Sequence, residues 1–180
     1  MKINTSLLLP LLFLLAIGCS EQLRVRSDYD KDVNLRLYKT YAWLPVKEIE
    51  SKTNPLVYNE LTDKRIKRAV DAQLKVKSIQ YTADSPDLRV HYHIVIDNKS
   101  MVRPATYGYN YSQYWIRNQM DVYQYREGTL IIDLMDAKNN NLIWRGWGTA
   151  ILDNGDIDLR EEEINDAVYK ILKEFPPTKN

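Results

Sequence analysis

The chain has 180 residues, of which 25 are Lys or Arg and 24 are Asp or Glu, so its formal net charge is +1. This balance argues against a nucleic-acid-binding surface, which normally carries a clear basic excess. The chain has one cysteine, which excludes a disulfide framework, so the fold must depend on the hydrophobic core of a domain of this length.

The N-terminus has the pattern of an export leader. A basic start is followed by an apolar run from Leu7 to Ile17 and then by Gly18 and Cys19. The run is about half of the roughly 20 residues that cross a bilayer as a helix, and small residues before a cysteine are typical of a cleaved lipoprotein signal. We expect residues 1–18 to be a signal peptide, Cys19 to be lipidated, and residues 19–22 to form a short tether. The alternative is an ordinary secretory signal with an incidental cysteine.

Lipidation would fix where the protein is found. Several acyl chains on Cys19, palmitate among them, would hold the protein on the membrane of a Gram-negative cell envelope. Ser20, rather than Asp, is compatible with delivery to the outer membrane. The sequence leaves open whether the domain faces the periplasm or the cell surface.

Residues 23–177 have the patterns of a single α+β domain. Alternating apolar and polar residues and runs of strand formers predict strands. The predicted strands are residues 23–29, 39–44, 79–82 and 88–96, followed by a hairpin over Thr129–Ile151 with a turn at residues 139–141. In the return strand, Gly146 and Gly148 share a face with Trp144, which leaves room for a close neighbour or indicates a bulge.

Two segments have the apolar stripe of an amphipathic helix. In the first, one helical face carries Ile66, Ala69, Val70, Gln73 and Leu74; in the second, the stripe is Ile164, Ala167, Val168, Ile171, Leu172 and Phe175. The cations beside the first stripe form either a partner-binding strip or, as we favour, a solvated outer face. The order of elements predicts a two-layer α+β sandwich, with both helices packed on one face of a mostly antiparallel sheet.

The same segments carry a family resemblance. They are Tyr38–Pro45, Arg65–Leu74, Pro86–His93, Glu127–Leu134, Leu142–Gly146 and Phe175–Pro177. In this order, the segments resemble the bacterial lipoproteins of the DUF4136 family, a domain of unknown function found mainly in Gram-negative envelopes. The resemblance implies a two-layer α/β sandwich behind a lipid anchor, and it implies no catalytic residues.

The segment from Met101 to Arg126 departs from the family and is rich in aromatic residues. Its candidate ligand-binding residues are Tyr107, Tyr109, Tyr111, Tyr114 and Trp115, within a Tyr-rich stretch over residues 107–125. Aromatic rings suit sugar stacking or a protein partner. Tyrosine is also a good strand former, so the alternative, which we favour, is a β extension or a loop whose rings cover an edge of the sheet.

His91 and His93 are the only histidines, and their i, i+2 spacing places both on one face of a strand. This pair is a weak candidate for zinc or copper, because a site needs at least a third ligand. The sequence shows no carboxylate at a telling spacing, so we expect no metal and a pair packed on the sheet surface. Asp133 and Arg145 could pair across the hairpin, but its register is open.

No motif for hydrolysis, phosphate binding or dinucleotide binding is present in the chain. We therefore expect a non-catalytic binding or assembly module without a cofactor, which touches the membrane through its lipid and has a possible protein partner in the envelope. The alternative is a glycan or small-ligand binder that uses the Tyr-rich segment. An enzyme is the third hypothesis, and it would need a carboxylate-based site that motifs do not reveal.

Overall fold

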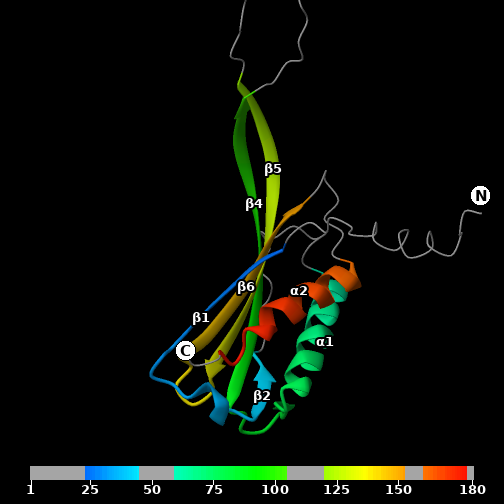
Figure 1. Cartoon of the computed structure of the whole chain (residues 1–180). Helices are drawn as coiled ribbons and strands as arrows, with labels where there is room; N and C mark the ends of the chain where they lie inside the picture. Colours follow the sequence, from blue (N-terminus) through cyan, green and yellow to red (C-terminus); the bar gives the residue numbers. More distant parts are fainter. Residues whose placement is uncertain (1–22, 45–58, 105–119, 153–159, 178–180) are drawn as a thin grey trace, which may run out of the picture.

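The computed structural model describes residues 23–44, 59–104, 120–152 and 160–177. The fold is α+β, as predicted: a mixed six-stranded sheet carries two helices that lie side by side on one of its faces (Figure 1). The elements are β1 (Arg24–Tyr29), η3 (Leu35–Leu37), β2 (Thr40–Trp43), α1 (Glu60–Val76), β3 (Gln80–Tyr81), β4 (Leu88–Pro104), β5 (Met120–Asp136), β6 (Leu142–Leu152) and α2 (Glu161–Lys173).

The strand order is β1-β6-β5-β4-β2-β3. The pairs β1·β6, β6·β5 and β5·β4 are antiparallel, whereas β2 pairs in parallel with both β4 and β3. The parallel pairs arise because α1 lies between β2 and β3 in the chain, and a helical crossover returns the chain to the same end of the sheet. The sheet is therefore antiparallel on the side of β1 and parallel on the side of β3.

Local sequence explains where α1 begins and ends. The side chain of Asn59 accepts a hydrogen bond from the backbone N–H of Thr62 at 2.9 Å, which satisfies one of the free donors of the first turn. At the other end, Ser78 has a φ of 62°, a left-handed conformation that stops the helix. The buried residues between these ends are Thr62, Ile66, Ala69, Val70 and Leu74, which largely reproduces the predicted stripe.

A shared carboxylate connects α1 to the sheet. Asp71 accepts hydrogen bonds from the Tyr41 hydroxyl at 2.6 Å and from the Trp43 indole Nε1 at 3.0 Å. Burial and the bond to Asp71 raise the pKa of Tyr41. The helix layer is therefore positioned by polar contacts as well as by its apolar face.

The core lies between the helices and the sheet, and Trp144 is its largest fully buried side chain. The Trp144 ring meets the Phe175 ring edge to face, with 5.3 Å between their centroids. It also lies over Gly146, where an added Cβ would come within 2.8 Å of Ile171 Cγ2 on α2. The space that the missing side chain of Gly146 leaves beside Trp144 is thus occupied by α2.

β4 and β5 are nearly twice as long as expected. They pair without interruption from Leu88↔Asp136 to Pro104↔Met120, whereas the pairing of β6 with β5 ends at Leu152↔Arg126. Residues 99–104 and 120–125 therefore form a two-stranded ribbon, here called the arm, which projects from one end of the sheet beyond both helices (Figure 1). The expectation of a β extension in the Tyr-rich segment is confirmed for residues 120–125.

Candidate functional site

The face of the sheet opposite the helices carries a row of polar side chains. His91 on β4, Asp133 on β5 and Arg145 on β6 lie opposite one another in the register, and His93 is two residues along β4 on the same face. Three adjacent strands at the centre of the sheet therefore bring these four side chains together. We call His91, His93, Asp133 and Arg145 the polar cluster.

Asp133 and Arg145 form a bidentate ion pair. Arg145 Nε donates to Asp133 Oδ1 at 2.6 Å, and Arg145 Nη2 donates to Oδ2 at 2.7 Å. Asp133 is 4% exposed, and its hydrogen bond and charge raise the pKa of Arg145. A carboxylate this deeply buried requires such a partner, because an unpaired charge inside a protein is strongly disfavoured.

Both histidines turn toward this carboxylate. His91 Nδ1 and His93 Nε2 lie 3.0 Å apart, and His93 Nε2 lies 3.5 Å from Asp133 Oδ2. Burial and, to a smaller extent, the neighbouring His93 lower the pKa of His91, against an opposing effect of Asp133. His91 is therefore neutral at neutral pH, the form in which an imidazole nitrogen can accept a hydrogen bond or bind a metal.

The polar cluster offers two imidazole nitrogens and one carboxylate oxygen within 4.8 Å of one another. The sequence places the two histidines on one face correctly, but it does not show the third donor. Asp133 is 42 residues beyond His91 in the chain, and only the pairing of β4 with β5 brings the two opposite each other. The available signal is a carboxylate in the middle of an otherwise apolar strand, since such a residue needs a partner.

The arm presents apolar side chains on both of its faces. Val102 and Val122 are paired on one face and are 57% and 63% exposed, and Met101 and Tyr123 are paired on the other face and are 39% and 48% exposed. The rings of Tyr123 and Tyr125 are stacked, with 6.4 Å between centroids and an interplanar angle of 16°. The arm is thus an exposed ribbon with little charge at its centre.

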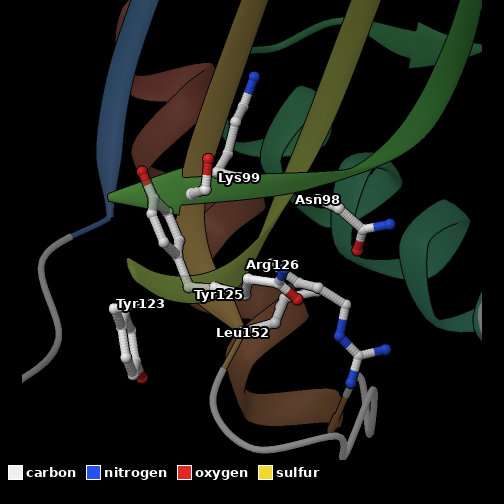
Figure 2. Close-up of a pocket in the computed structure, with 8 residues that line it drawn as sticks. Asn98, Lys99, Tyr123, Tyr125, Arg126 and Leu152 are labelled. Atoms are coloured by element: carbon white, nitrogen blue, oxygen red, sulfur yellow. The ribbon is translucent and has the colours of Figure 1, made fainter. Parts of the chain in front are cut away.

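A groove of about 660 Å³ lies where the arm joins the sheet. Figure 2 shows the rings of Tyr123 and Tyr125 to one side of the hairpin and the side chains of Asn98 and Arg126 to the other. The lining residues are Asn98, Lys99, Ser100, Tyr123, Gln124, Tyr125, Arg126 and Leu152. The groove combines stacked rings with cationic groups.

Several predicted residues lie outside the described part of the chain. They are the leader and tether with Cys19, and the ligand-binding candidates Tyr107, Tyr109, Tyr111, Tyr114 and Trp115. Lipidation and a role for these five aromatic residues stay predictions. Neither of the two helices that the structure describes combines the length and hydropathy needed to cross a membrane.

Among solved structures, the chain is similar to a PDZ domain protein from Parabacteroides distasonis ATCC 8503. The two are 19% identical with a TM-score of 0.59; the match covers 89% of this chain but only 37% of that protein. The chain also resembles PelC, a dodecamer from Paraburkholderia phytofirmans. A point variant of PelC is 12% identical with a TM-score of 0.46, and PelC in a second crystal form is 11% identical with a TM-score of 0.44; each match covers 84% of this chain and 95% of PelC. These similarities concern the fold alone.

No curated protein matches the chain. A family match, in contrast, spans residues 25–177 and therefore covers nearly the whole of the predicted domain. This match confirms the resemblance seen in the sequence. The protein belongs to the family described as Domain of unknown function (DUF4136).

Proposed function

We propose that the protein is a non-catalytic binding or assembly module of the Gram-negative cell envelope, anchored through a lipid on Cys19, that holds a protein partner with its arm. The observation that carries this proposal is the uncovered apolar surface on both faces of the arm, with Val102 and Val122 more than half exposed. A lone two-stranded ribbon is marginally stable in water, so it gains most when another surface covers it.

The proposed two-layer arrangement fits this role. The helices cover one face of the sheet, so the core is complete without the arm, and the arm contributes little to it. A ribbon that the core does not need can be kept for contact with another molecule. The leader pattern supports the anchor, which would place this contact at a membrane.

Site-specific photocrosslinking in intact cells tests the arm. We expect a crosslinking amino acid at Val102 or Val122 to give a discrete adduct with a protein partner. The same amino acid at Val76, a valine on α1 that is 79% exposed, is the matched control and should give none. The adduct should be found in the membrane fraction. In a Cys19→Ser chain, the protein should no longer incorporate palmitate and should no longer be retained in the membrane fraction.

With the crosslinking amino acid at Val102, the change Val122→Lys on the paired strand should abolish the adduct while changing the free energy of unfolding by only about 0.5 kcal/mol, because the Val122 side chain is exposed. Crosslinking from the arm that is no stronger than from Val76 would contradict the proposal.

The groove favours a second candidate function, the binding of a glycan or small ligand by the Tyr-rich segment. Stacked Tyr123 and Tyr125, together with Lys99, the cross-strand partner of Tyr125 on the same face, suit a sugar ring with an acidic or hydroxyl-rich edge. We expect Tyr125→Ala to lower the affinity for such a glycan, found by array screening, by at least about tenfold, a loss of about 1.4 kcal/mol. Tyr169→Ala on α2, where Tyr169 is 50% exposed, should leave this affinity unchanged. Equal affinities of the two variants would argue against the groove.

A further inference from the structure

We propose that His91, His93 and Asp133 form a binding site for a divalent transition-metal ion, and that zinc is the ion their donor atoms fit. This site lies on the open face of the sheet and is independent of the arm. Its donors are one nitrogen from each imidazole and one oxygen of the carboxylate, all within 4.8 Å of one another.

The distances between the donors suit a small ion. With zinc–ligand bonds of about 2.0–2.1 Å in a tetrahedral site, neighbouring donor atoms lie about 3.3 Å apart. The separation of His91 Nδ1 from His93 Nε2 is 3.0 Å, and that of His93 Nε2 from Asp133 Oδ2 is 3.5 Å. These two separations bracket the ideal, and the third, between a His91 nitrogen and an Asp133 oxygen, is at most 4.8 Å, so the donors must close up around the ion by side-chain rotation.

The donor types select the kind of ion. Imidazole nitrogens suit zinc, copper and nickel, whereas calcium and magnesium take oxygen ligands. Three protein ligands leave a fourth position for water or an incoming group. Solvent can reach the site on the side of His93, because the side chain of His93 is 46% exposed.

Arg145 is the positioning residue of the proposed site. Its two hydrogen bonds fix the orientation of the Asp133 carboxylate, and a metal-bound carboxylate normally has such partners. Oδ2 has a second lone pair for the ion. The positive guanidinium also opposes a bound cation, so we expect an affinity in the micromolar range rather than that of a structural zinc site.

The experiment uses the full-length chain in detergent and Zn²⁺ alone, titrated by calorimetry. We expect one equivalent to bind, and both imidazoles to shift in NMR spectra; since the chain has only two histidines, these signals are unambiguous. His91→Gln and His93→Gln should each weaken binding at least about tenfold. Asp97→Asn is the matched control, because Asp97 lies on the same face of β4 and is 57% exposed. This change should leave the affinity for Zn²⁺ unchanged. Cys19→Ser should bind as the parent does.

The histidine variants are the decisive ones, because they should stay folded. Both rings lie on the open face of the sheet, so their loss should leave the circular dichroism spectrum unchanged. Asp133→Asn should also weaken binding, but it disturbs the ion pair with Arg145. Absence of binding up to about 1 mM Zn²⁺, or binding that persists in the chain lacking both histidines, would overturn the proposal.

Discussion

A Gly146→Ala chain is expected to lose about 3 kcal/mol of its free energy of unfolding, at the upper end of the usual cost of overpacking a core. The added Cβ would lie 2.8 Å from Ile171 Cγ2 on α2 and 2.8 Å from Cζ2 of the Trp144 ring, and closer still to Cη2 of that ring. Both neighbours are fully buried, so neither can move away without displacing the helix or the strand. Chemical denaturation followed by circular dichroism measures the loss.

Gly148→Ala is the matched control for this prediction. Its added Cβ would meet Leu23 Cδ1 at 3.2 Å and Ile171 at 3.3 Å, contacts that a small shift relieves, so we expect a change within about 1 kcal/mol. In a Trp144→Phe background, Gly146→Ala should cost much less, because phenylalanine lacks the outer ring atoms that the Cβ would strike. Equal losses from the two glycine variants would show that close packing beside Trp144 is not the cause.

An Arg145→Met chain is expected to lose about 2 kcal/mol of its free energy of unfolding, because the buried carboxylate of Asp133 would lose its bidentate partner. This value lies below the usual range for a buried pair, since the Arg145 side chain is 43% exposed and water already screens part of the attraction. The free energy of unfolding near pH 7 is the quantity to measure.

Two further variants separate this prediction from a general effect of removing arginine. Arg24→Met removes an exposed partner of Glu127 and should cost no more than about 1 kcal/mol. Asp133→Leu combined with Arg145→Met should recover most of the stability, because no unpaired charge then stays buried. A loss in Arg145→Met no greater than in Arg24→Met would refute the role given to the ion pair.

The helices and most strands could be predicted because each of them buries one face in the core, so that its apolar residues recur with the period of a helix or a strand. The stripe from Ile66 to Leu74 and the alternation in residues 130–135 reflect a core on one face only, and that period is visible in a single sequence. The turn at residues 139–141 was also predictable: Asn140 has a φ of 58°, which asparagine tolerates, and Asp136 caps the turn through the N–H groups of Lys138 and Asn139.

The arm and the parallel pairs were not predictable from local patterns. In the arm both faces are exposed, so no buried side imposes a period of two, and β4 was expected to end at Ile96 rather than at Pro104. The direction of β2 depends on how the chain returns after α1, a property of the whole connection rather than of the strand.

Only the two histidines of the polar cluster could be placed together from the sequence. The spacing of His91 and His93 places their side chains on one face without any knowledge of the fold. The position of Asp133 depends on register, because a shift of one residue between β4 and β5 would move it to the helix-covered face. The sequence therefore predicts a pair, and the pairing of the strands supplies the third donor.

The strand β1 begins at Arg24, at the same end of the sheet from which the arm projects, and Arg24 is paired with Glu127 near the base of the arm. The five residues from Cys19 to Leu23 can span at most about 17 Å, whereas the six residues of each strand in the arm extend about 20 Å. With the proposed lipid in place, the described part of the arm would reach further than the segment that joins Cys19 to the sheet. The arm would therefore have to lie along the lipid headgroups or point away from them. Either orientation limits the directions from which a partner can approach.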